Sequence, residues 1–188
     1  MFGRQVLLPF AVVALFLPAR AFAFGIGIEG GVTGTYANGL PGGYSNAAGG
    51  ATLGLIVEDE FDLPLVFLDV WADGQLNTLR FQTGGVSPAE YLPFDLGLRV
   101  GLGFALLHPY VGLFGQMAFP TSDGGGPSLS SPLFGVGGDL GLDFAVFIFR
   151  FGIELRGVDI LSSIPSDGSG VPSGAWEIQG LGSARFSF

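Results

Sequence analysis

The sequence predicts an all-β protein, an eight-stranded antiparallel up-and-down transmembrane β-barrel. Three observations lead to this fold class. Apolar residues recur at every second position over most of the chain, which is the side-chain period of a β-strand. The segments that connect these stretches alternate between long and short. The charged residues of the stretches fall on one face only, which leaves the other face free to contact lipid.

The N-terminal segment, residues 1–23, is predicted to be a secretory signal peptide. A basic residue near the start is followed by an apolar run over residues 6–17 and by small residues in A-x-A spacing, so cleavage is expected after Ala21 or Ala23. A membrane anchor is the alternative reading. It requires about 20 apolar residues, and this run is shorter and bracketed by prolines. The barrel is therefore expected to span residues 24–188.

Eight strands are expected in the barrel. Between residues 92 and 106 every even position holds a large apolar residue, whereas the odd positions hold Pro, Asp, Gly, Arg and Ala. A helix would mix these two sets, and a strand separates them. The same alternation gives the other strands. In order, the expected strands are residues 24–36, 50–58, 65–73, 92–106, 110–119, 133–144, 147–156 and 175–188.

The connections support an outer-membrane barrel. Long stretches rich in Gly, Pro and Ser follow the first, third, fifth and seventh strands, whereas "DEFDLP", "LLHP" and "AV" follow the second, fourth and sixth. Outer-membrane barrels have short periplasmic turns, long outer loops and an even number of strands. Both ends of the barrel chain are thus expected on the periplasmic side. The only histidine, His108, is expected in the second short turn.

The charges provide an independent test of the alternation. Within the expected strands all of them share the inward parity, and the outward parity holds none. A charge on the lipid face would cost up to about 2–4 kcal/mol at mid-membrane, so this sorting is expected of a barrel. The inward charged residues are Glu29, Glu58, Asp69, Asp73, Asp95, Arg99, Asp139, Asp143, Arg150, Glu154, Arg156, Glu177 and Arg185.

Composition argues against several other functions. The chain has 16 acidic and 7 basic residues, whereas a nucleic-acid-binding protein needs a basic face. It has no cysteine and one histidine, which disfavours a zinc site. The stretch "GIGIEG" at residues 25–30 matches a dinucleotide-binding fingerprint, but its glycines lie inside a strand that no helix follows. No cofactor, metal or catalytic residue is therefore expected.

The inward charges are expected to form a network of arginines and carboxylates. A charge in a narrow interior must be paired or hydrated, so the network is expected to plug the lumen; a small gated pore is the alternative. The middle of the barrel is expected to hold Asp69, Asp95 and Arg99. The periplasmic mouth is expected to hold Glu29, Asp143, Arg150 and Arg185. Asp139 and Glu154 complete the predicted network, and Glu177 is expected near the outer mouth, where water can replace a partner.

Taken together, the signal peptide, the eight alternating strands, the unequal connections and the terminal Phe188 resemble the small outer-membrane β-barrel family typified by the OmpA and OmpX membrane domains. In that family the terminal aromatic strand is similar to the signal read by the barrel-assembly machinery. The resemblance therefore implies that Phe186 and Phe188 form an assembly signal. No segment follows the last strand in this sequence, so the peptidoglycan-binding domain of some members is not expected.

The expected function is that of a non-enzymatic, monomeric barrel in the outer membrane, with outer-membrane lipid and an unidentified extracellular ligand as partners. Its role is structural, adhesive or ligand-binding, through the outer loops. Some eight-stranded barrels are lipid A-modifying enzymes with His, Ser and an acid near the outer rim. This chain has no H-x-S arrangement and its histidine is expected at the other end, so that alternative is less favoured. The expected loop contacts are Arg80, Phe81, Tyr91, Ile160, Leu161 and Ile164.

Overall fold

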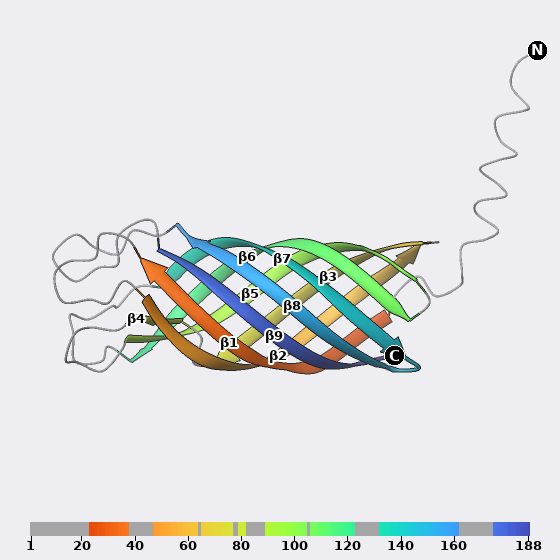
Figure 1. Ribbon diagram of the computed structural model, residues 1–188, viewed down its shortest axis with the longest axis horizontal. Helices are drawn as coiled ribbons and strands as arrows, with labels where there is room; N and C mark the ends of the chain where they lie inside the picture. Colours follow the sequence, from red (N-terminus) through yellow and green to blue (C-terminus); the bar gives the residue numbers. More distant parts are fainter. Residues whose placement is uncertain are drawn as a thin grey trace, which may run out of the picture.

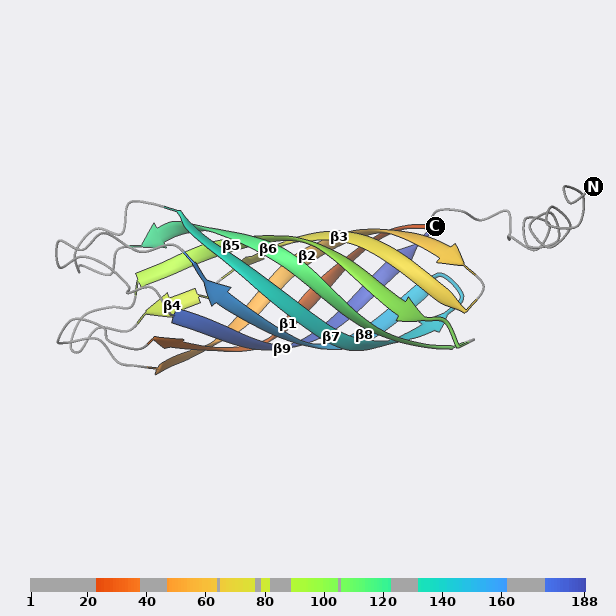
Figure 2. The same cartoon turned by 90° about the horizontal axis from the view of Figure 1, so that it is seen from above.

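The computed structural model describes residues 23–37, 47–63, 65–76, 79–81, 89–104, 106–122, 132–161 and 175–188. Long strands tilt round a common axis (Figure 1), and the view from above shows the same tilted cylinder (Figure 2). Within these ranges no helix is long and apolar enough to span a membrane. In chain order the strands are β1 (Ala23–Ala37), β2 (Ala47–Leu63), β3 (Val66–Leu76), β4 (Leu79–Phe81), β5 (Ala89–Leu102), β6 (Leu107–Ser122), β7 (Leu133–Val146), β8 (Phe149–Ile160) and β9 (Ala175–Ser187).

The sheet closes on itself. Each strand pairs antiparallel with its neighbour in the order β3-β2-β1-β9-β8-β7-β6-β5-β4, and an additional pairing of β3 with β5 completes the ring. The short strand β4 pairs with β5 beside this ring. The eight other strands form an up-and-down antiparallel barrel, which confirms the predicted fold class. Closure leaves none of these eight strands with an open edge over its paired length.

The two ends of the barrel differ. The turns β2–β3, β5–β6 and β7–β8 lie at the same end as the start of β1 and the C-terminus (Figure 1), and we call it the short-turn end. There the backbone of Phe24 exchanges two hydrogen bonds with that of Phe188, of 3.0 and 3.2 Å. We call the opposite end the loop end. The predicted signal peptide lies outside the described residues except for Ala23, the first residue of β1.

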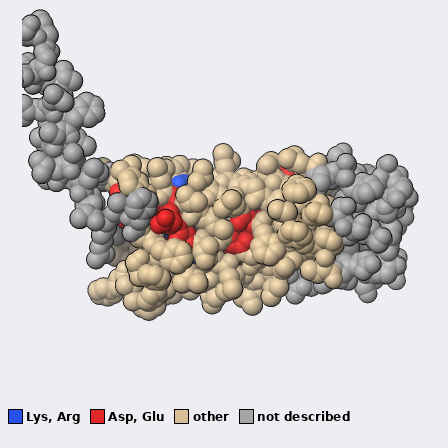
Figure 3. Space-filling model, turned by 180° about the vertical axis from the view of Figure 1, so that it is seen from behind, with Lys and Arg blue, Asp and Glu red and all other residues tan. Residues whose placement is uncertain are grey.

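The polarity of the barrel is inverted relative to a soluble protein. Along β3 the exposed and buried positions alternate, with Leu68 and Val70 exposed and Asp69 and Trp71 buried. The other strands repeat this alternation, so large apolar side chains cover the outside. Figure 3 shows one face on which uncharged residues cover most of the surface and few acidic atoms are visible. Since an apolar surface of this size is unfavourable in water, the outside is suited to lipid.

Several strands extend beyond their predicted ends. β2 continues to Leu63, so Glu60 takes an inward position that the sequence analysis had assigned to a turn. β6 begins at Leu107, so the prediction that His108 lies in a turn is wrong. His108 lies within the strand, with its ring centroid 5.6 Å from that of Phe67. The strands can continue through Glu60 and His108 because both side chains take the inward positions of their strands, where the other polar side chains lie.

Two of the short turns contain a bulky residue in the left-handed backbone region. Phe147 has φ 56° in the two-residue turn between Val146 and Phe149, and Leu65 has φ 75° between β2 and β3. For an L-residue this conformation costs about 1–2 kcal/mol relative to glycine. The sequence predicts this β7–β8 turn two residues earlier, at "AV", because the apolar run contains no Gly or Asn to mark it.

Some inward glycines are required by the close approach of neighbouring strands. A Cβ atom added to Gly31 in β1 would lie 1.9 Å from the carbonyl oxygen of Gly180 in β9. On the same strand, a Cβ added to Gly34 would meet no atom within 4 Å. The β1–β9 seam therefore needs glycine at the first position and tolerates a side chain at the second.

We predict that Gly31→Ala destabilises the barrel by about 1–3 kcal/mol, the usual cost of overpacking. Gly34→Ala is the matched control and should be neutral or slightly stabilising, since alanine loses less backbone entropy than glycine. Urea midpoints in phospholipid vesicles would measure both effects. Equal stability of the two variants would contradict the tight β1–β9 contact.

Candidate functional site

The interior of the barrel is the most densely charged part of the described structure. Fourteen charged side chains that are buried or nearly so point inward from the ring strands. Four are arginines: Arg99, Arg150, Arg156 and Arg185. Ten are acidic: Glu29, Glu58, Glu60, Asp69, Asp73, Asp95, Asp139, Asp143, Glu154 and Glu177. The carboxylates thus outnumber the arginines by 10 − 4 = 6, so every arginine can be surrounded by acids.

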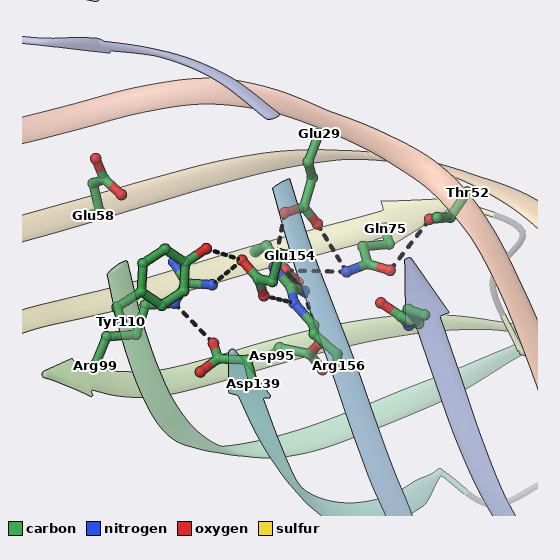
Figure 4. A network of polar contacts seen from close by, with 12 residues as sticks. Glu29, Thr52, Glu58, Gln75, Asp95, Arg99, Tyr110, Asp139, Glu154 and Arg156 are labelled. Carbon is green, nitrogen blue, oxygen red and sulfur yellow. Dashed lines mark hydrogen bonds and ion pairs between the residues drawn. The ribbon is translucent and has the colours of Figure 1, made fainter. Parts of the chain in front are cut away.

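Arg156 is the centre of the network (Figure 4). Its guanidinium on β8 is fully buried and contacts four carboxylates. The Nη2 atom donates to Glu29 on β1 at 2.8 Å, and Nη1 lies 3.4 Å from Asp95 on β5. Nη1 also donates to Asp73 on β3, and Nε donates to Glu154 on β8 itself. One side chain thereby joins four strands of the ring across the lumen.

Glu154 connects this centre to a second arginine. Arg99, on β5, donates from Nη2 to Glu154 at 2.7 Å and from Nε to Asp139 on β7 at 2.8 Å, and its Nη1 lies 3.7 Å from Asp69 on β3. The hydroxyl of Tyr110 also donates to Glu154, at 2.7 Å. Glu154 therefore accepts hydrogen bonds from two arginines and a tyrosine, which offsets the cost of burying its charge.

Aromatic rings fill the space between these charges. The guanidinium carbons of Arg99 and Arg156 lie 4.1 and 4.4 Å from the ring centroid of Trp71. Arg99 also lies 4.8 Å from the Tyr110 ring centroid, and the Trp71 and Phe114 ring centroids are 5.4 Å apart. Cation–π contacts of desolvated arginines stabilise such an arrangement by about 2 kcal/mol each. The cross-section at this height is thus occupied by two planar cations and aromatic side chains.

A second cluster lies nearer the short-turn end. Arg185 on β9 donates to Glu58 on β2 and to Asp143 on β7. Arg150 on β8 binds Glu60 through both terminal nitrogens and lies 3.6 Å from Glu58 and 4.0 Å from Asp143. Glu58 and Asp143 are thus shared between two arginines, as Glu154 is in the centre.

Neutral polar groups extend the network toward the loop end. The amide of Gln75 donates to Glu29 at 2.8 Å and to Asp73 at 3.1 Å, and it accepts from Thr52 at 3.2 Å. On the other side, Glu177 accepts hydrogen bonds from the hydroxyl of Thr33 and the amide of Gln179. Figure 4 shows the first of these chains running from the arginine centre to Thr52. Among the described residues, no group of His, Asp or Glu has the arrangement that would hold a metal ion.

No family model and no curated protein matches the chain. Its fold, however, matches solved structures of small barrels. Neisserial surface protein A superposes with a TM-score of 0.53 over 88% of this chain and 99% of that one, at 12% identity. The attachment invasion locus protein Ail of Yersinia pestis gives a TM-score of 0.52 over 88% of this chain and 97% of that one, also at 12% identity. The same protein in complex with the heparin analogue sucrose octasulfate gives 0.53, at 12% identity, over 89% of this chain and 97% of that one.

The chain has the fold of the small eight-stranded outer-membrane β-barrels. This agrees with the resemblance to OmpA- and OmpX-type domains that the sequence indicates. At 12% identity the likeness concerns the fold.

The structure groups the predicted network residues differently from the sequence analysis. Glu29 was expected near the periplasmic mouth, but it binds Arg156 in the centre, because the stagger of β1 against β2 and β9 brings it to that height. Asp95 approaches Arg156 as well, at 3.4 Å. Asp143, Arg150 and Arg185 do lie together.

Some participants were missing from the predicted network. Arg156 has the inward parity, but nothing in the sequence distinguishes it from the other inward arginines. Glu60 has the same parity as Glu58, and it could have been found by continuing that alternation into "DEFDLP". The expectation that Glu177 is solvated near the outer mouth is wrong, because its side chain is completely buried.

Two of the predicted loop contacts are also wrong. Tyr91 lies in β5 and Ile160 in β8, both facing inward with 1% and 2% of their surface exposed, because these strands begin earlier and end later than predicted. Leu161, the next residue, is 56% exposed. The backbone of Arg80 and Phe81 forms part of β4, while their side chains and the whole of Ile164 lie outside the described residues.

The aromatic residues of the last strand face outward. Phe186 and Phe188 pack at a tilt with ring centroids 5.7 Å apart, and the Phe188 ring also lies 5.5 Å from that of Phe24. Phe149 of β8 lies 5.7 Å from Phe186. These rings form one apolar cluster on the outer surface at the short-turn end. Their role as an assembly signal stays a prediction.

We predict that Arg156→Met destabilises the barrel by about 3–5 kcal/mol, because it leaves buried carboxylates without their cation. Asp73→Asn should also be destabilising in the wild-type background. In the Arg156→Met background the same change should instead restore part of the lost stability, since it removes an uncompensated charge. Urea midpoints of the four proteins would measure this coupling, and strictly additive effects would contradict the buried network.

Proposed function

We propose that the protein is an integral outer-membrane barrel whose interior is sealed and whose loop end contacts an extracellular ligand or surface. The observation that carries the proposal is the inverted polarity of the barrel, with apolar side chains outside and an ion-pair network inside. Lipid is the solvent that suits this outside, since a closed barrel leaves no unpaired backbone groups for it to meet.

Aromatic residues at the loop end support a membrane position. Trp176 on β9 faces outward, and its ring lies 5.5 Å from that of Tyr36, its register partner on β1. Tryptophan and tyrosine gather at the boundary between hydrocarbon and water, because each has an apolar ring and a polar group. This pair marks where the apolar band would meet the outer headgroups.

The network supports a sealed lumen over an open pore. Arg99 and Arg156 together contact carboxylates on β1, β3, β5, β7 and β8, so their ion pairs cross the interior in several directions. Trp71 lies beside both guanidiniums. An eight-stranded barrel has an interior just wide enough for side chains to fill. The proposed role is therefore that of a rigid support for the segments at the loop end.

A contact role is the function we propose for these segments. The solved barrels of similar fold include a neisserial surface protein and an attachment invasion protein. The latter binds a heparin analogue in one structure. Outside the lumen, the connections at the loop end and the residues beside them hold four acidic residues, Glu90, Asp123, Asp159 and Asp167, against one basic residue, Arg80. We therefore infer a neutral or cationic partner in place of a polyanion.

The proposal gives the protein no catalytic role. His108 lies at the start of β6 near the short-turn end, against the ring of Phe67. A lipid A-modifying site would instead lie near the outer rim. We further propose that residues 1–23 are removed as a signal peptide and that Phe186 and Phe188 are read by the barrel-assembly machinery.

We predict that Leu113→Arg destabilises the barrel in phospholipid vesicles by about 2–4 kcal/mol, the cost of an arginine facing mid-membrane lipid. Leu113 lies in the middle of β6 and is 75% exposed. Leu161→Arg at the loop end is the control and should cost about 0–1 kcal/mol, because its side chain can reach water. Equal urea midpoints for the two variants would argue against a membrane-spanning barrel.

We also predict that the purified barrel produces no conductance steps in planar lipid bilayers, because side chains fill its cross-section. Arg99→Ala removes one of the cations that fill the centre and serves as the comparison. Reproducible steps in the wild-type protein that grow larger in Arg99→Ala would support the gated pore instead. Folding of both proteins should be checked by heat-modifiable migration on gels.

A further inference from the structure

The short turns of the barrel are apolar, although turns that face water are normally polar. Each of the three carries large hydrophobic side chains that protein contacts leave exposed. Phe147 is fully exposed and Leu65 is 70% exposed. We call this set the apolar turn tips: Leu65, Phe104, Leu106, Phe147 and Ile148.

Two of these residues occupy strained backbone positions. Phe147 and Leu65 have φ values of 56° and 75°, a region where glycine or asparagine is usual in turns. Glycine would remove the strain, and a polar residue would suit water better. Their presence indicates that the apolar side chain itself is useful at the tip.

The apolar turn tips continue the outer surface of the barrel without a break on β7 and β8. The outward residues next to the turn are Phe144, Phe149 and Phe151, all exposed. The other outward aromatic residues at this end, in the described part of the chain, are phenylalanines too, including Phe24, Phe186 and Phe188. Unlike Tyr36 and Trp176 at the loop end, they have no polar group with which to meet water.

We propose that the short-turn end is seated in the lipid leaflet, with the apolar turn tips inserted among the lipid chains at the headgroup boundary. Lipid is the occupant of this surface, because the apolar turn tips are continuous with the outer face of the barrel. That face contacts lipid in the proposed function, on which this inference rests. Asp59 is exposed on β2 at this end, opposite Phe24. Its charge reaches the headgroups, while the tips of β5–β6 and β7–β8 provide the apolar contacts.

Tryptophan reporters in lipid vesicles test the proposal. Trp176→Phe removes the native exposed tryptophan, and Trp71 remains as a constant signal because it is 1% exposed inside the lumen. Phe147→Trp in this background places a reporter at a turn tip, and Ile148→Trp is a second reporter should the first fail to fold. Leu113→Trp is the control for the middle of the barrel. Each is refolded into phosphatidylcholine vesicles with bromine near the headgroup or deep in the chain, and iodide is added as an aqueous quencher.

We expect the turn-tip reporter of Phe147→Trp to lose more than half of its emission in shallow-brominated lipid and to be protected from iodide. Strong iodide quenching without lipid quenching would overturn the proposal, because the tip would then lie in water. Protection from both quenchers would overturn it in favour of a protein contact, such as a second copy of the chain. Deep-brominated lipid should quench the mid-barrel reporter of Leu113→Trp in every case; if it does not, the membrane location itself fails, and the two failures are thereby distinguished.

Discussion

A charge inside a narrow closed barrel has little water to hydrate it, and this constraint governs the rest of the structure. Each of the four inward arginines is compensated by contacts with carboxylates. Most of these carboxylates lie on strands that are not adjacent in the sheet to the strand of the arginine. Arg156 on β8 contacts Glu29, Asp73 and Asp95 on three other strands, and Arg185 on β9 contacts Glu58 on β2. Backbone hydrogen bonds fix the order and register of adjacent strands, whereas these ion pairs also connect opposite walls of the barrel. The network thus gives the barrel a defined cross-section, at the cost of desolvating each charge.

Glycine makes such a network possible at this diameter. A Cβ atom on Gly112 would lie 2.2 Å from the carboxylate of Asp139 and 2.8 Å from the Arg99 side chain. A Cβ atom on Gly152 would lie 2.4 Å from the carboxylate of Asp143 and 2.8 Å from the guanidinium of Arg185. Long charged side chains therefore lie over positions of the inner wall that have no side chain. The large number of glycines in the sequence, 34 of 188 residues, is explained in part by this packing.

The sequence was sufficient for the parts of the structure that depend on alternation alone. The fold class and the inward position of residues such as Asp69 and Arg150 follow from parity, because lipid and lumen impose opposite polarity on neighbouring residues. The pairing of charges was not predictable in the same way. Glu29 meets Arg156 because of the stagger between strands, and stagger depends on the closed geometry of the whole ring. Strand ends were also missed where no turn residue marks them. Glu60, Tyr91 and Ile160 all lie in such extensions, and apolar residues such as Phe147 occupy the turn itself.

The distribution of ion pairs over the strands has a consequence for the order of assembly. The contacts of Arg156 outside its own strand and those of Arg185 are all to strands that do not neighbour them in the sheet. In an isolated hairpin, or in a sheet that has not closed, these charges would therefore lack their partners. Closure of the ring brings the β1–β9 seam, these ion pairs and the Phe24–Phe188 contact together, and an open sheet has none of the three.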